Sequence, residues 1–116
     1  MDQNNKIYDL EERTFKFAER AQNFVKKLTR TITNIENGRQ LARSAGSVAA
    51  NYIEANEALS KKDFVMRIKI CRKEAKESRL WIKLSDSQST PQDKEVLIQE
   101  ATELTKIFGA ILEKSK

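Results

Sequence analysis

The sequence predicts an all-α protein, an up-down-up-down antiparallel four-helix bundle that forms one domain over residues 1–116. Only three glycines and one proline occur in 116 residues, so few positions interrupt a helix. Apolar residues make up a modest 39% of the chain, but they recur at steps of three, four or seven, which keeps one face of an α-helix inward. Short polar segments separate four such stretches, and a short connection returns the chain beside the preceding helix.

The first helix is expected at residues 9–33. Asp9 can cap its N-terminus, and Glu12 three residues later completes a capping-box pattern. The amides and the glycine of residues 34–38 are expected to end the helical pattern. The buried stripe consists of apolar residues at helical spacing: Leu10, Phe17, Ala21, Phe24, Val25, Leu28 and Ile32.

The second helix is expected at residues 39–58 because apolar side chains repeat there at heptad-like spacing. Those residues are Leu41, Ala45, Val48, Tyr52, Ala55 and Leu59. A second face carries small side chains: Ala42, Gly46, Ala49 and Ala50. Glycine costs about 1 kcal/mol relative to alanine inside a helix. Close packing at Gly46, within the subunit or between subunits, would offset that cost.

The third helix is expected at residues 61–84, where Ser60 and Asp63 form a second capping-box pattern. Its inward residues are Phe64, Ile68, Cys71, Ala75, Ser78 and Ile82. The fourth helix is expected at residues 91–114, with Thr90 as the cap and Pro91 at the first position, which needs no N–H donor. Asp93 complements the positive end of the helix dipole. Its inward residues are Leu97, Ala101, Leu104, Phe108 and Ile111.

Composition excludes several kinds of site. The chain has no histidine and a single cysteine, so an ordinary zinc site, a histidine base and an intramolecular disulfide are not available. The N-terminal stretch has no apolar run of the kind found in secretory signals, and no window approaches the roughly 20 apolar residues that a membrane span requires. We therefore expect a cytoplasmic protein without a metal or cofactor.

Positive charge is concentrated in the third helix. Residues 60–84 contain nine cations and three anions, a net charge of +6, whereas the rest of the chain carries −1. Arg72, Lys76, Arg79 and Lys83 recur at steps of four, three and four, so they share a face on which they repel one another by a few tenths of a kcal/mol per pair.

An external anion, most simply a nucleic-acid backbone, would complete this face. The candidate nucleic-acid-binding residues are Arg67, Arg72, Lys76, Arg79 and Lys83. The alternative is a solvated face whose cations pair with acidic residues of the first and fourth helices, such as Glu95, Glu100 and Glu103. No aromatic residues interleave with the cations, so binding would depend on charge and shape, with little sequence readout.

Polar residues also occupy one face of each central helix. Ser44, Ser47, Asn51 and Glu54 share a face of the second helix, while Glu74 and Glu77 share a face of the third. If the faces meet, Asn51 and Glu54 can pair with Lys73, Lys69 or Arg43. The expected structural polar network is Arg43, Asn51, Glu54, Lys73, Glu74 and Glu77.

The same carboxylates allow a second interpretation. Glu54, Glu74 and Glu77 could form an acid–base or metal site, but di-metal helical bundles normally add Glu-x-x-His pairs, which this chain cannot supply. No nucleophile or Gly-rich phosphate loop accompanies them either. We therefore predict no catalytic and no metal-binding residues.

Residues 43–84, RSAGSVAANYIEANEALSKKDFVMRIKICRKEAKESRLWIKL, resemble the signature of the 23S rRNA-intervening-sequence protein family. The similarity covers about a third of the chain. It comprises a Ser-rich helix, an Asn-x-x-Glu-Ala segment, a Ser-Lys-Lys-Asp-Phe cap and a Lys-Glu-Ala-x-Glu-Ser-x-x-Trp helix. The matching residues are Arg43, Ser44, Asn51, Glu54, Ala55, Ser60, Lys62, Asp63, Phe64, Lys73, Glu74, Glu77, Ser78 and Trp81.

The resemblance implies an up-down bundle that assembles into a ring-like homo-pentamer with a basic surface and no established enzymatic activity. Some members of the family are encoded within insertions in large-subunit rRNA genes. A related branch, the accessory variability determinants of diversity-generating retroelements, binds a reverse transcriptase and nucleic acid.

The residues and the resemblance together predict a non-enzymatic homo-oligomer that binds RNA or DNA through backbone electrostatics. Repetition of the basic helix around a ring would convert weak contacts of single subunits into useful affinity. The alternative is a protein–protein adaptor or accessory subunit, in which the same face docks an acidic partner such as a reverse transcriptase.

Overall fold

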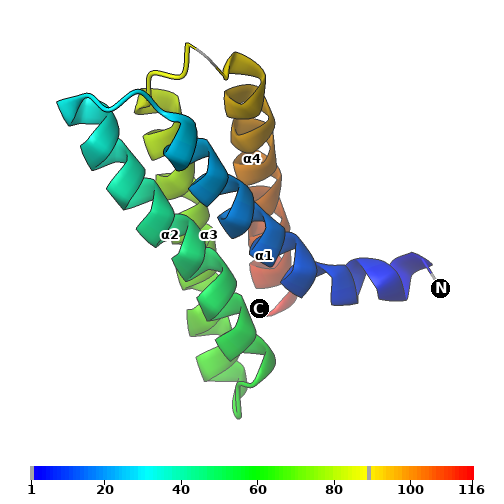
Figure 1. Cartoon of the computed structure of the whole chain (residues 1–116). Coiled ribbons are helices and arrows are strands. Elements are labelled where there is room, and N and C mark those ends of the chain that lie inside the picture. Colours follow the sequence, from blue (N-terminus) through cyan, green and yellow to red (C-terminus); the bar gives the residue numbers. More distant parts are fainter. Residues whose placement is uncertain (1, 89) are drawn as a thin grey trace.

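The computed structural model describes residues 2–88 and 90–116, with side chains from residue 10 onward. It contains four helices: α1 (Asp2–Lys27), α2 (Ile32–Asn56), α3 (Lys61–Leu84) and α4 (Pro91–Lys114). Successive helices run in opposite directions, and α2, α3 and α4 lie side by side along the bundle (Figure 1). The prediction of an all-α, up-down-up-down four-helix bundle is confirmed.

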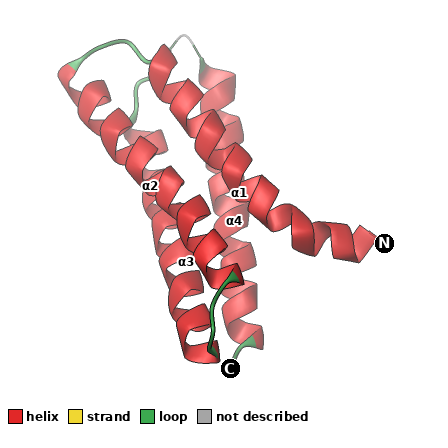
Figure 2. Cartoon of the chain, turned by 60° about the horizontal axis from the view of Figure 1, so that its bottom comes forward, coloured by secondary structure: helices red, strands yellow, loops and turns green. Residues whose placement is uncertain are grey.

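The four helices do not contribute equally to the bundle. Over the described residues, α3 packs along both α2 and α4, whereas α1 packs mainly on α2 and meets α4 over a shorter stretch. The N-terminal end of α1 extends away from the other three helices in both views (Figures 1 and 2). The helix α3 therefore has the most extensive packing. Its side that faces away from α2 and α4 is not covered by another helix over the described residues.

The start of the first helix differs from the prediction. The helix begins at Asp2 and continues through Asp9, so the chain does not enter the helix at Asp9; the side chain of Asp9 lies outside the described residues. Residues 2–8 include neither glycine nor proline, and ordinary residues differ in helix propensity by less than about 0.7 kcal/mol each. Nothing in this stretch therefore stops the helix.

The connection between the first two helices was also predicted wrongly. The first helix ends at Lys27, before residue 33, and the second begins at Ile32, before residue 39. Thr31 caps α2, because its hydroxyl oxygen accepts a hydrogen bond from the backbone N–H of Asn34 at 3.1 Å. Ile32 is consequently exposed at the first turn of α2 and does not extend the buried stripe of α1.

Asn34 does not break the helix. Its side chain forms hydrogen bonds to the two interhelix connections at this end of the bundle. Its buried amide group donates to the carbonyls of Thr29 at 2.9 Å and Asp86 at 3.1 Å, and accepts from the Asp86 N–H at 2.9 Å. These bonds join the α1–α2 connection to the α3–α4 connection. Residues 34–38 therefore lie inside α2, where the glycine also has a role.

The two glycines of α2 lie in different surroundings. A Cβ atom at Gly38 would approach Cγ1 of Val25 to 2.9 Å, so the glycine lets α1 and α2 lie close together. At Gly46, no atom lies within 4 Å of the corresponding position, apart from the adjacent residues and the nearby backbone of α2 itself. The expected packing of a helix on Gly46 within the subunit is therefore not found.

The buried core follows the predicted stripes closely. Of the residues expected inside, Ile32 and Leu59 are exposed, while Val25, Phe64 and Ile111 are partly buried. Leu59 lies beyond the end of α2, which explains its exposure. The core residues are Leu10, Phe17, Ala21, Phe24, Leu28, Leu41, Ala45, Val48, Tyr52, Ala55, Ile68, Cys71, Ala75, Ile82, Leu97, Ala101, Leu104 and Phe108.

The caps of the last two helices were predicted with different success. The Ser60 side chain accepts a hydrogen bond from the Asp63 N–H at 3.1 Å, which confirms the predicted start of α3. Thr90 occupies the cap position of α4 and Pro91 follows it, but the Thr90 side chain makes no cap hydrogen bond. Its backbone, with φ −140° and ψ 55°, departs from the extended conformation typical of a capping residue.

None of the helices in the described ranges combines the length and apolar character that crossing a bilayer requires.

Candidate nucleic-acid interface

Two arginines of α3 lie beside α4, and two lysines share their helix face by spacing. Arg79 donates from Nε to the Thr102 hydroxyl at 2.9 Å. Nε of Arg72 lies 3.5 Å from the position of a Cβ atom at Gly109, so that glycine leaves room for the arginine. We call Arg72, Lys76, Arg79 and Lys83 the basic stripe. The predicted sharing of one helix face therefore corresponds to a row beside a second helix.

The basic stripe has no acidic partner in the described part of the chain, where no carboxylate lies within 4.0 Å of any of its four cations. The alternative prediction had assigned Glu95, Glu100 and Glu103 to this role. Glu95 is exposed and belongs to no ion pair among the described residues. The other two carboxylates bind a cation of α1.

That cation is Arg13. Its Nε and Nη2 donate to the two carboxylate oxygens of Glu100 at 2.7 and 2.9 Å, and Nη2 also donates to Glu103 at 2.8 Å. The hydrogen bond to Glu100 is the main cause that raises the pKa of Arg13. Hydrogen bonds from Gln99 and then from Arg13 lower the pKa of Glu103. Both carboxylates thus join α4 to α1, and pairing of Glu100 and Glu103 with the α3 cations is not what the structure shows.

An open groove adjoins the basic stripe. It is lined by Lys69, Arg72, Lys73, Lys76 and Glu77 of α3, with Leu112 of α4 at its edge. The three lysines and Arg72 are exposed, so their charged groups are accessible to a ligand. A row of cations with a single acidic neighbour suits a chain of phosphates better than an isolated small anion.

Arg67 lies apart from the basic stripe. Its Nη1 donates to Oδ1 of Asn51 at 3.1 Å, and its Nε lies 3.9 Å from Asp63, so the guanidinium is held between α2 and α3. Arg67 precedes Arg72 by five residues, and five residues turn an α-helix by about 500°, which places it on another face. This spacing could have excluded Arg67 from the predicted set.

Four members of the predicted polar network come together. Nη2 of Arg43 lies 3.7 Å from Glu74 and 3.8 Å from Glu77, and Nζ of Lys73 lies 4.0 Å from Glu77. Glu74 is buried, and its Oε1 has no hydrogen-bond partner at shorter range among the described residues. The cluster joins α2 to α3 by charge.

The other two members lie elsewhere. Asn51 donates to Ser47 and accepts from Arg67, not from Lys73, Lys69 or Arg43 as predicted. The side chain of Glu54 is exposed and makes no hydrogen bond or ion pair within the described ranges. The antiparallel register that pairs Asn51 with Arg67 places Glu54 opposite the first turns of α3, away from Lys73 and Arg43.

A buried hydroxyl pair was not predicted as a contact. The Oγ atoms of Ser44 and Ser78 lie 2.7 Å apart in the α2–α3 interface, and the Ser44 hydroxyl also reaches the Leu41 carbonyl at 3.3 Å. Both serines had been noted on inward or polar faces, but their meeting depends on helix register.

No cluster of three or more potential metal ligands occurs in the part of the chain that the structure describes.

The fold and the basic α3 face define a class of small helical-bundle proteins. The family described as 23S rRNA-intervening sequence protein matches residues 6–110, so the chain belongs to this family. A crystal structure of a protein with unknown function from the S23 ribosomal protein family of Bacteroides thetaiotaomicron is similar, with a TM-score of 0.74 and 28% sequence identity. The similarity covers 88% of this chain and 96% of that one. No curated protein matches the chain.

Proposed function

We propose that this protein binds RNA or DNA through the basic stripe, as a ring-like homo-oligomer that catalyses no reaction. One observation carries the proposal: four cations share one side of α3, and within the described residues none has a carboxylate within 4.0 Å. Leaving these like charges together is unfavourable unless a polyanion neutralises them.

The dimensions of the basic stripe suit a nucleic-acid backbone. From Arg72 to Lys83 the helix rises by about 16 Å, which corresponds to roughly five base pairs along one strand. The Arg79 side chain is fixed by Thr102, and the remaining cations are free to follow the phosphates. The groove contains no aromatic residue on which a base could stack, which favours backbone contacts over sequence readout.

The absence of catalysis is supported by how the reactive groups are placed. Glu54 is separated from Glu74 and Glu77, so the three carboxylates do not form one acid–base site. Burial raises the pKa of the Cys71 thiol to about 12. A buried, protonated thiol is a poor nucleophile.

The assembly is supported by the family resemblance and by exposed apolar side chains. Phe15, Ile53 and Met66 are each about half exposed, on three different helices. Burying such side chains between subunits would be favourable. Repetition of the basic stripe in an oligomer would raise the affinity for a long polyanion.

Binding of labelled RNA hairpins and duplex DNA, followed by fluorescence anisotropy over a salt series, tests the proposal. The double variant Arg72→Glu, Arg79→Glu should bind more than tenfold more weakly than the wild type. The control, Lys16→Glu with Arg20→Glu, changes the net charge equally on α1 and should bind nearly as well as the wild type. Circular dichroism verifies that both variants remain helical.

Two results would contradict the proposal. Equal loss of affinity in both double variants would mean that net charge, and not the basic stripe, governs binding. Wild-type protein that binds neither nucleic acid at low salt, or whose affinity does not fall with salt, would exclude phosphate neutralisation. The second result would favour the docking of an acidic protein on the same face.

A further inference from the structure

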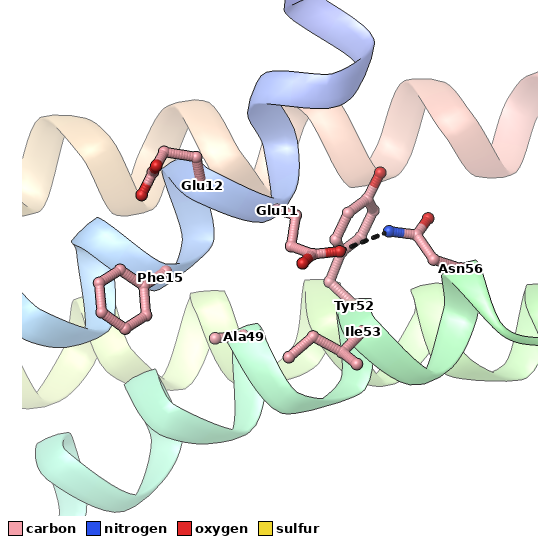
Figure 3. Close-up of a pocket in the computed structure, with 7 residues that line it drawn as sticks. All are labelled: Glu11, Glu12, Phe15, Ala49, Tyr52, Ile53 and Asn56. Atoms are coloured by element: carbon pink, nitrogen blue, oxygen red, sulfur yellow. Dashed lines mark hydrogen bonds between the residues drawn. The ribbon is translucent and has the colours of Figure 1, made fainter.

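Two apolar patches on the surface are rimmed by charges of opposite sign. The first is a pocket between α1 and α2, lined by Glu11, Glu12, Phe15, Ala49 and Ile53, which we call the acidic pocket. Phe15 from α1 and Ala49 and Ile53 from α2 line the same hollow (Figure 3). Phe15 is 57% exposed and Ile53 47% exposed, so the apolar floor remains open to water.

The carboxylates of the acidic pocket have no cationic partner among the side chains that the structure describes. Glu11 accepts a hydrogen bond from the Asn56 amide at 3.2 Å, as the dashed line in Figure 3 shows. No cation with a described side chain lies within 4.0 Å of Glu11 or Glu12. The pocket therefore offers an apolar surface and two available negative charges.

The second patch lies on the first two turns of α3. Its residues are Lys61, Lys62, Val65, Met66 and Lys69, which we call the lysine patch. Met66 is 53% exposed, and none of the three lysines pairs with a carboxylate in the described ranges. The patch has an apolar centre and a positive rim, which is the complement of the acidic pocket.

The two patches lie at the same height along the bundle, on different sides. Arg67 of α3 donates a hydrogen bond to Asn51 of α2, so these two residues lie at the same height. Met66 and Ile53 are their near neighbours in sequence and therefore lie at almost the same height. Over the described residues α1 does not pack on α3, so the patches face in different directions. Contacts between unlike patches at one height can close into a ring, whereas an axial offset would produce a helical filament.

We propose that the lysine patch of one subunit docks in the acidic pocket of a second copy of this chain, in a head-to-tail arrangement. Met66 would contact Phe15 and Ile53, while the lysines would approach Glu11 and Glu12. A second copy is the occupant that the surface favours, because each subunit carries both complementary patches. The inference rests on the oligomer of the proposed function, and it leaves the four cations of the basic stripe outside the contact.

The mass of the full chain in solution, measured by light scattering after size-exclusion chromatography, tests the arrangement. Ile53→Lys puts a positive charge in the acidic pocket, and Met66→Glu puts a negative charge in the lysine patch. Each variant alone should elute at the mass of one subunit. The matched controls are Ile35→Lys on α2 and Leu80→Glu on α3, whose native side chains are 44% and 48% exposed, and these should assemble like the wild type.

Mixing the two disrupted variants identifies the head-to-tail contact. The Ile53→Lys subunit keeps an intact lysine patch and the Met66→Glu subunit keeps an intact acidic pocket, so one good contact can form. The mixture should therefore assemble into dimers or larger species, whereas neither variant assembles alone. A contact between identical patches would not be rescued in this way.

Each other outcome overturns the inference. If wild-type protein assembles and both patch variants retain its mass, the interface lies elsewhere, while the proposed function stands. If both variants dissociate but their mixture gives no dimer, the contact is not head-to-tail. A single-subunit mass for the wild type would exclude this interface and the ring together, whereas nucleic-acid binding would still be judged by its own salt series.

Discussion

Arg13 determines which acidic residues remain available elsewhere on the molecule. It binds Glu100 through two parallel hydrogen bonds and reaches Glu103 with a third. A lysine could not provide this planar fork. Both carboxylates lie on α4, the helix that borders the basic stripe. Because they bind α1, the stripe has no neutralising partner among the described side chains.

Replacement of Arg13 by alanine should lower the free energy of unfolding by about 1 kcal/mol at pH 7, the upper range for a partly exposed ion pair with good geometry. The pKa of Glu103 is lowered from its ordinary value near 4.5, so its contribution is present above that pH and is lost as the pH falls through the folded-state pKa. Urea unfolding at pH 7 and pH 3 measures the difference. A difference that persists unchanged at pH 3 would show that lost packing, not charge, explains the effect.

Cys71 provides a second test at this scale. Its side chain is fully buried, its Sγ lies 3.6 Å from the Val48 carbonyl oxygen, and burial raises the pKa of the thiol to about 12. Folded protein at pH 8 should therefore react with a thiol reagent at least tenfold more slowly than unfolded protein. Because the chain has one cysteine, the absorbance change reports this thiol alone. Equal rates would place Cys71 at an accessible position.

The two glycines of α2 show how close helix packing and helix propensity oppose each other. A Cβ atom added at Gly38 would come too close to the Val25 side chain. A Cβ atom added at Gly46 would point into open space in the described subunit. Alanine has about 1 kcal/mol more helix propensity than glycine at either position. The surroundings therefore determine whether an added methyl group stabilises the bundle.

Gly46→Ala should raise the free energy of unfolding by up to about 1 kcal/mol, because the methyl group meets no described atom within 4 Å. Gly38→Ala should lower it, because Val25 is branched at Cβ and has little freedom to withdraw. Thermal unfolding of the two variants side by side compares them. Stabilisation by both substitutions would contradict the close contact between α1 and α2.

Element positions were largely predictable from apolar spacing, whereas the α1–α2 boundary was not. The amide of Asn34 resembled a loop signal, but its partner Asp86 lies 52 residues away in sequence, and no local pattern identifies it. Gly38 likewise resembled a helix end until its contact with Val25 was known. The cap at Ser60 depends on neighbouring residues alone and was predicted correctly.

The candidate site also has a part that the sequence predicts and a part that it does not. The common face of Arg72, Lys76, Arg79 and Lys83 followed from spacing, and spacing would also have set Arg67 apart. The partner of Glu100 could not be read from the sequence, because Arg13 lies 87 residues away on a helix whose placement depends on the whole bundle. Local periodicity thus predicts faces, while pairing between faces requires the tertiary structure.

At the scale of the whole molecule, the acidic and the basic surfaces are separated. The acidic pocket and the lysine patch lie at one height on different sides, and the basic stripe continues along α3 toward the opposite end of the bundle. A head-to-tail ring would bury the first two surfaces and repeat the third around its axis. Assembly and nucleic-acid binding would then depend on different residues of the same helix.

The salt dependence of duplex DNA binding tests the central claim most directly. Each phosphate that a cation neutralises contributes about 0.9 to the slope of log K against log salt concentration. Replacing Arg72 and Arg79 by glutamine should reduce the magnitude of that slope by roughly two per engaged subunit, with oligomer mass unchanged. An identical slope in the wild type and the variant would show that the basic stripe does not contact the phosphates.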